Sequence, residues 1–424
     1  MRMKWPAAIM LMGMLLLIAG QSANASAGVV KETSAGASVS ARIVEGEIPA
    51  AALTSEVWSC NLQTKDSSII VRQGVTYISQ SQLAAMLRDL VWRVGTPSGS
   101  IQVSGPNHTL SLSMGSRYAV MNGVKRKMSG ASFVQNGVQY LPLRDVVSWA
   151  GGTVNVDAQG KLTIAYTVRS MVIAGDSGTY WVRRDNGIVY TAAGSEMPHQ
   201  IGRSKVRAGD QYSIRITELA ENSTLLSINH NYGSPTLKLN NDEYRLIVYR
   251  GMLVRESFVH YLGVQPIQYA EAGGGIAAMM NGTELQLVQP NGRLTARIDL
   301  LKLVNEQLTV DKPGYSFDKA FTLEYVSVEE RIALVKPYST YDMLLVDMNA
   351  GTVTELYKEL LPQDEVEMMN RWKTEPTDFK YQGDRIAFER RDGNVLIFSH
   401  ETLHDSIPYT EDRITELRYT LQLS

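Results

Sequence analysis

Cysteine is almost absent from this chain of 424 residues, since Cys60 is its only one. A single thiol cannot form an intramolecular disulfide, so an apolar core and hydrogen bonds must hold the fold together. No cationic residue near Cys60 in the sequence would activate the thiol. We therefore expect a small buried residue there.

An excess of charge of either sign is also missing. The 41 Lys and Arg residues nearly balance the 43 Asp and Glu residues, which gives a formal net charge of −2. Proteins that bind nucleic acids typically carry a basic excess or patch, so we expect no nucleic-acid partner.

Long apolar runs are missing after the N-terminal segment, where residues 7–19 form an apolar stretch. Arg2 and Lys4 precede this stretch, and Ala23-Asn-Ala25 follows it, which is the order of a secretory signal peptide. The stretch is shorter than the roughly 20 residues of a membrane-spanning helix. We predict a cleaved signal peptide at residues 1–25 and an extracellular or wall-associated protein without an integral membrane domain. Retention of the segment as an N-terminal anchor is the alternative.

Residues 26–51 are rich in Ser, Ala and Gly and contain no aromatic residue, which predicts a flexible linker. The rest of the chain is long enough for two domains that each bury a core. We place an α+β domain with two repeats at residues 52–166 and an all-β domain at residues 167–424.

The first of these domains contains an internal repeat. Gly74 and Gly137 stand 63 residues apart in matching segments. Each copy reads as strand, tight glycine turn, strand, short amphipathic helix and two further strands. The two helices are expected at residues 81–94 and 143–150.

The second copy carries the most specific motif of the chain. Tyr140-Leu-Pro-Leu-Arg144 is followed by a helical segment and then by Gly152-Thr-Val-Asn-Val-Asp157. This pattern resembles the copper amine oxidase N-terminal (stalk) domain. The resemblance implies a scaffold that performs no chemistry itself. The first copy departs from the pattern, with Ser79 where the second has Pro142.

The motifs of amine oxidase catalysis are missing. None of the six histidines forms the H-x-H pair that binds copper in that family, and Asn231-Tyr232 is followed by Gly233 rather than by an acidic residue. We therefore predict no copper, no quinone cofactor and no other cofactor.

The C-terminal region reads as a series of hairpins. The turns Asp185-Asn-Gly187, Pro290-Asn-Gly292 and Asp392-Gly393 supply the positive φ that tight hairpins need. Similar strand pairs begin near Tyr180, Leu225, Ile276, Ile332 and Ile386. This spacing favours a propeller-like fold of five or six blades, with a β-sandwich as the alternative.

Two further elements are expected in this region. Residues 362–372 have the apolar spacing of a helix. We expect residues 416–423 to form a closing strand that completes the first blade.

One segment matches a catalytic motif literally. His400-Glu-Thr-Leu-His404 reads H-E-x-x-H, which binds zinc when both histidines lie on one helix face. The apolar run directly before it predicts a strand instead, and a strand separates the two side chains. We therefore predict no metal site. An exported metal-dependent hydrolase that uses His400 and His404 is the alternative function.

Tyrosine is abundant, with 20 residues against seven phenylalanines. Aromatic side chains near hairpin ends can stack on sugars or peptides, and the candidates are Tyr180, Trp181, Tyr190, Tyr338 and Tyr341. Half-buried strand residues are the simpler interpretation of the same pattern. The acidic pairs Glu329-Glu330 and Glu411-Asp412 are expected to be solvated surface.

These observations favour a secreted, non-enzymatic protein whose stalk-like domain positions a β-rich binding domain. Its partner would be a cell-wall polymer or an extracellular protein.

Overall fold

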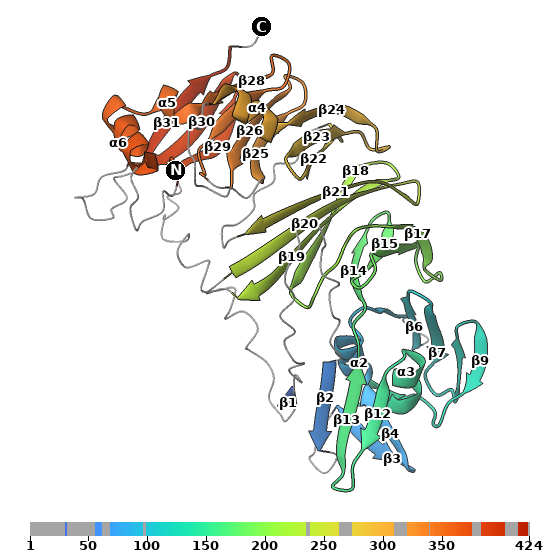
Figure 1. Cartoon of the computed structure of the whole chain (residues 1–424). Coiled ribbons are helices and arrows are strands. Elements are labelled where there is room, and N and C mark those ends of the chain that lie inside the picture. Colours follow the sequence, from blue (N-terminus) through green and yellow to red (C-terminus); the bar gives the residue numbers. More distant parts are fainter. Residues whose placement is uncertain are drawn as a thin grey trace, which may run out of the picture. The chain divides into compact units, whose positions relative to one another are not determined.

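The computed structural model describes residues 30–31, 56–61, 68–95, 99–234, 238–262, 274–308, 320–338, 340–374, 383–402 and 414–422. These residues are mostly β-strand, in small antiparallel sheets joined by short helices (Figure 1). They fall into two compact units. The first unit holds the described residues up to 232 and residues 246–256, and the second unit holds residues 233–245 and those from 257 onward.

The predicted signal peptide lies outside the described residues. Among the residues that are described, no helix is long and apolar enough to cross a membrane. Two residues of the predicted flexible linker, Val30–Lys31, form strand β1, which pairs with β2 (Glu56–Asn61). Cys60 lies in β2.

The predicted repeat is present in the first unit. Strands β3 (Ile69–Arg72) and β4 (Val75–Ser79) form one hairpin, and β10 (Phe133–Gln135) and β11 (Val138–Pro142) form the other. The two hairpins join through β4 and β11 into a four-stranded antiparallel sheet. The copies therefore pair with each other through their second strands.

The turns and helices of the two copies also correspond. Gly74 has a φ of +73° and Gly137 a φ of +76°, as tight hairpin turns require. Helices α2 (Gln80–Met86) and α3 (Leu143–Trp149) begin and end 63 residues apart. The prediction of a first helix that continues to residue 94 is wrong, because Val91–Val94 is strand β5.

Two more sheets complete this domain. Strands β5 to β9 form a five-stranded antiparallel sheet in chain order, and the sheet of β1, β2, β12 and β13 has the order β1-β2-β13-β12. Alternate strand residues and the apolar faces of α2 and α3 form one core. The remaining strands are β6 (Ser100–Gly105), β7 (His108–Ser113), β8 (Tyr118–Met121), β9 (Val124–Lys127), β12 (Thr153–Val156) and β13 (Lys161–Tyr166).

Five small antiparallel sheets of consecutive strands follow in the part of the chain that the structure describes. Their strands are, sheet by sheet, β14 (Ser170–Gly175), β15 (Gly178–Arg183), β16 (Ile188–Ala192) and β17 (His199–Arg203); β18 (Tyr212–Ala220), β19 (Ser223–Ser234), β20 (Lys238–Tyr249) and β21 (Met252–Leu262); β22 (Ala277–Asn281), β23 (Glu284–Val288) and β24 (Leu294–Asp299); β25 (Phe321–Ser327), β26 (Ile332–Pro337), β27 (Leu344–Asp347) and β28 (Thr352–Glu355); β29 (Ile386–Asp392), β30 (Val395–Glu401) and β31 (Ile414–Thr420).

The three predicted hairpin turns are confirmed, because each lies between paired strands: β15 and β16, β23 and β24, and β29 and β30. The predicted helix at residues 362–372 is confirmed as α6 (Gln363–Thr374). Two shorter helices, α4 (Leu300–Gln307) and α5 (Leu356–Leu360), also lie in the second unit.

The sheet of β25 to β28 is buried on both faces. On β26, Ile332 and Leu334 belong to a core shared with β29 to β31, whereas Ala333 and Val335 belong to a core shared with β22 to β24. Because successive strand residues point to opposite faces, this sheet lies between its two neighbours. Three sheets of the second unit are therefore stacked face to face.

The prediction of a closing strand is wrong. Residues 414–420 form β31, which pairs antiparallel with β30 from Val395↔Thr420 to Glu401↔Ile414. The strand thus completes the last sheet instead of the first. The first sheet already has four strands of its own, in the order β14-β15-β16-β17.

Candidate functional site

A buried carboxylate marks the candidate site, which lies entirely in the first unit. Asp89, on the turn between α2 and β5, is 5% exposed. The Tyr166 hydroxyl donates to its Oδ1 at 2.6 Å, and the backbone N–H groups of Arg169 and Ser170 donate to Oδ2 at 2.8 and 3.2 Å. A buried charge is costly unless it is hydrogen-bonded, and these three donors offset that cost.

The turn that carries Asp89 also contacts the sheet of β14 to β17, the first of the five consecutive sheets. The indole N–H of Trp181, on β15, donates to the Asp89 carbonyl at 3.0 Å, and the Trp181 side chain is fully buried. Arg93 donates to the hydroxyl of Thr179 at 3.3 Å. Val91 packs against the cluster that contains Trp181. Side chains of β5 and its preceding turn therefore contact the β14 to β17 sheet directly.

A cavity of about 270 Å³ opens beside this carboxylate. Its lining mixes polar and apolar groups, with cationic side chains from the segment that follows β13 and from β15. The lining residues are Asp89, Leu90, Pro106, Asn107, His108, Ala150, Gly151, Tyr166, Thr167, Arg169, Ser170 and Arg183.

His108 is the titratable ring of this cavity. It follows a turn in which Asn107 has a φ of +66°, and it contacts the Trp149 ring edge-on with centroids 5.7 Å apart. Its Nδ1 is buried and has no hydrogen-bond partner among the described residues. Burial is the main cause that lowers the pKa of His108, and the nearby cations Arg169 and Arg183 lower it further against the opposing effect of Asp89. The ring is therefore neutral at pH 7.

Two guanidinium groups complete the polar lining. Arg183 pairs with Asp185 through bonds of 3.0 and 2.7 Å, and this pairing raises the pKa of Arg183. The Arg169 guanidinium has no acceptor within the described ranges. Burial, followed by the Asp89 carboxylate, raises the pKa of Tyr166, so its hydroxyl remains a proton donor to Asp89.

This arrangement can bind a small group with hydrogen-bond acceptors. Within the described residues, no group of three or more His, Cys, Asp or Glu side chains is placed to hold a metal ion.

None of these cavity residues was among the sequence-based candidates. One signal was available, because Asp89 stands 63 residues before Gly152 and so replaces a glycine of the second copy. An acidic residue at such a position indicates a role specific to one copy. Its hydrogen-bond donors come from residues 166–170, a closeness that only folding creates.

The aromatic candidates are mostly buried, which favours the simpler interpretation as strand residues over a stacking surface for sugars or peptides. The exposed fractions are 4% for Tyr180, 0% for Trp181, 8% for Tyr190 and 5% for Tyr338. Tyr341 is half-buried and packs against Tyr338 with ring centroids 5.2 Å apart. These side chains point into sheet cores, as strand tyrosines commonly do.

The H-E-x-x-H segment is not helical where the structure describes it. His400 lies on β30, and its Nε2 is 2.8 Å from Oε2 of Glu365 on α6. Glu401 pairs with Arg385 at 3.4 Å. His404 lies outside the described residues. The predicted strand is confirmed, and His400 already has a carboxylate partner.

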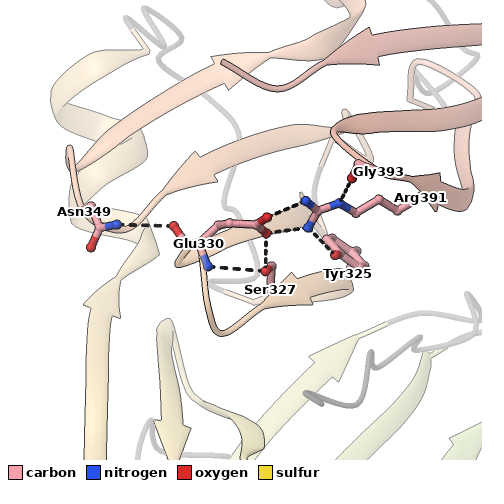
Figure 2. Close-up of polar contacts among 6 residues, drawn as sticks. All are labelled: Tyr325, Ser327, Glu330, Asn349, Arg391 and Gly393. Atoms are coloured by element: carbon pink, nitrogen blue, oxygen red, sulfur yellow. Dashed lines mark hydrogen bonds and ion pairs between the residues drawn. The ribbon is translucent and has the colours of Figure 1, made fainter. Parts of the chain in front are cut away.

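The prediction that Glu330 is a solvated surface carboxylate is wrong, because its carboxylate is paired. Figure 2 shows its two oxygens facing the guanidinium of Arg391, with which it forms a two-bond ion pair, and the Ser327 hydroxyl donating to one of them. The Arg391 and Ser327 bonds lower the pKa of Glu330 to about 2. Arg391 also donates to the hydroxyl of Tyr325 at 3.1 Å. The network links β25 to β29 across two sheets, whereas Glu329 is exposed as predicted. Glu411 and Asp412 lie outside the described residues.

The two-copy arrangement agrees with the comparison to known families. Residues 60–165 match the copper amine oxidase N-terminal domain. This part of the chain is a copper amine oxidase N-terminal domain. Both hairpins, both helices and the Asp89 turn of the candidate site lie inside it.

Comparisons that cover more of the chain identify no further family. No curated protein matches it. A protein of unknown function from Bacteroides caccae is 11% identical, covers 74% of this chain and 90% of its own, and has a TM-score of 0.21. The WD40 domain of Neurospora crassa Pan2 is 11% identical, with coverage of 62% and 64% and a TM-score of 0.17. At such low TM-scores, neither structure identifies the fold of this chain.

Proposed function

We propose that this chain is an exported, non-enzymatic binding protein of the cell surface, in which the copper amine oxidase N-terminal domain holds a β-rich region in place. The observation that carries the proposal is the Asp89 turn. Its carboxylate and carbonyl accept hydrogen bonds from Arg169, Ser170 and Trp181, which all lie beyond the domain. A fixed junction is what a supporting domain needs.

The β-rich region is proposed to be propeller-like. Its sheets follow one another as consecutive antiparallel strands, and β25 to β28 is packed on both faces by its neighbours. Blades of a propeller pack in this way, whereas the two sheets of a β-sandwich each leave one face to solvent. The face-to-face stacking therefore favours the propeller-like arrangement over the sandwich.

The proposed location and partner follow from the signal-like N-terminus, which favours export to the cell surface or the wall. The proposed partner is a wall polymer or an extracellular protein. No cofactor and no nucleic acid are part of the proposal. The alternative hydrolase gains no support from the described residues, among which no three His, Cys, Asp or Glu side chains are placed to hold a metal ion.

The junction can be tested with Asp89→Asn. An amide directs an N–H toward at least one of the three present donors, so we expect the unfolding free energy to fall by about 2 to 3 kcal/mol. Hydrogen exchange should speed up together in β5 and β14. The matched control is Asp176→Asn, at an exposed turn position. Unchanged exchange at β14 in Asp89→Asn would contradict the supporting role.

Export and binding need a separate measurement on the full chain. N-terminal sequencing of protein from the culture medium should begin at Ser26, and the protein should sediment with purified cell walls. Protein that stays in the cytoplasm would refute the proposal, and protein that never sediments with walls would refute a wall polymer as the partner.

A further inference from the structure

The charge of the copper amine oxidase N-terminal domain differs from that of the whole chain. Residues 60–165 contain ten Lys and Arg residues and four Asp residues, with no Glu, a formal net charge of +6 within a chain of −2. Residues 90–144 contain no acidic residue at all. The near-neutral total therefore conceals a basic domain.

Four of these ten cations, Arg93, Lys125, Arg126 and Lys127, lie on strands of the five-stranded sheet of β5 to β9. The register places Gln102, Ser111, Val120 and Lys125 side by side on four adjacent strands, and Lys127 opposite Tyr118. The opposite face is the core face, with Val103, Leu110 and Met121 buried. We name the outward-facing set of Gln102, Ser111, Tyr118, Val120, Lys125 and Lys127 the basic face.

The basic face is open at its β8 and β9 end. Tyr118 is 48% exposed and Val120 is 41% exposed. Lys125 lies over the Tyr118 ring, with its Nζ 5.0 Å from the centroid. Neither Lys125 nor Lys127 has an acidic partner in the described part of the chain.

We propose that the basic face binds a flexible polyol-phosphate polymer of the cell wall. Lys125 and Lys127 are two residues apart on one strand, so their side chains leave the sheet about 7 Å apart. They can each contact a phosphate, while the exposed Tyr118 and Val120 side chains contact the carbon backbone between charges. Gln102 and Ser111 add neutral donors and acceptors to the same face.

The chemistry of the face favours this polymer over a nucleic acid. Binders of single strands stack successive bases on several aromatic rings, whereas the basic face offers the single ring of Tyr118. A polyol phosphate needs only spaced cations and small apolar contacts. The inference rests on the proposed function, because the polymer is encountered only after export.

Binding of the full chain to poly(glycerol phosphate) tests the assignment, with neutral dextran and single-stranded DNA of equal phosphate number as comparisons. We expect binding that weakens with salt, and a salt slope that falls by about 0.7 for each lysine removed. Lys125→Ala and Lys127→Ala should each weaken binding about five-fold.

Arg126→Ala is the matched control, because Arg126 has the same charge and strand but pairs with Ala119 on the opposite face. It should change affinity less than about two-fold. Equal losses for Arg126→Ala and the lysine variants, tighter binding of the DNA, or no binding of the polymer would each overturn the assignment. The lysine variants could bind the polymer as wild type does while the protein still sediments with walls. This result would refute binding at the basic face but would leave the proposed function supported. If the protein fails to sediment with walls, a wall polymer is refuted as the partner in the proposed function as well.

Discussion

Individual charged residues in this chain acquire their roles from distant partners. Asp89 receives hydrogen bonds from residues 166–170, Glu330 pairs with Arg391, and His400 contacts Glu365. Asp89 and His400 are buried and Glu330 is partly buried, and an unpaired charge or polar atom is costly away from water. Their side chains therefore connect elements that are far apart in sequence through hydrogen bonds and ion pairs.

The stabilising effect of the Glu330–Arg391 ion pair should depend on pH. Because the fold holds the pKa of Glu330 near 2, below its ordinary 4.5, the ion pair stabilises the protein above about pH 4.5 and loses this effect as the pH falls toward 2. Arg391→Met should lower the unfolding free energy by about 1 kcal/mol at pH 7. Urea unfolding at pH 7 and at pH 3 measures the difference.

The control for this change is Arg390→Met, since Arg390 is 52% exposed and forms only loose pairs with Asp392 and Glu416 at 3.4 and 3.7 Å. Its effect should stay below about 0.5 kcal/mol. A loss in Arg391→Met that is equal at both pH values would argue that packing, not the ion pair, is responsible.

At the scale of elements, the strands of the stacked sheets differ from those of the copper amine oxidase N-terminal domain. β26 is buried at four successive positions from Ile332 to Val335, whereas β13 alternates between buried and partly exposed residues. A continuous apolar run is what a strand needs when both faces are covered. Such a run by itself does not reveal what covers each face.

Substitutions on β26 test the two-sided burial. Leu334→Ala should cost about 2 to 4 kcal/mol and Val335→Ala about 1 to 3 kcal/mol, because the two fully buried side chains fill different cores. Thr163→Ala on β13, at a partly exposed position, should cost less than about 1 kcal/mol. Chemical denaturation of the three variants makes the comparison. A neutral effect of either β26 substitution would contradict a core on that face.

At the scale of the whole molecule, stability should not depend on a metal. The described residues offer no cluster of three ligands, and His400 lies on a strand with its Nε2 at 2.8 Å from Glu365. Chelation with EDTA should therefore leave the thermal unfolding midpoint unchanged, and the purified protein should contain no stoichiometric zinc by elemental analysis. A zinc content near one per chain together with a lower midpoint after chelation would restore the hydrolase alternative.

Much of the local structure was predictable, because local chemistry determines it. Gly74 and Gly137 mark turns that need positive φ, and the spacing between them correctly placed a second copy of the same strands and helix. The first helix was predicted too long, because Val91–Val94 continues the apolar pattern but is extended by pairing with β6. Periodicity alone does not separate a short helix from a buried strand.

The sequence by itself determined the repeat, its turns, the hairpins of the β-rich region and the strand before His400. These depend on residues close together in the chain. Only the tertiary structure decided which sheet receives β31, which tyrosines are buried, and which groups surround Asp89 and the nearby cavity. Those outcomes depend on contacts between residues far apart in sequence, whose free energy is gained only when the chain closes the loops between them.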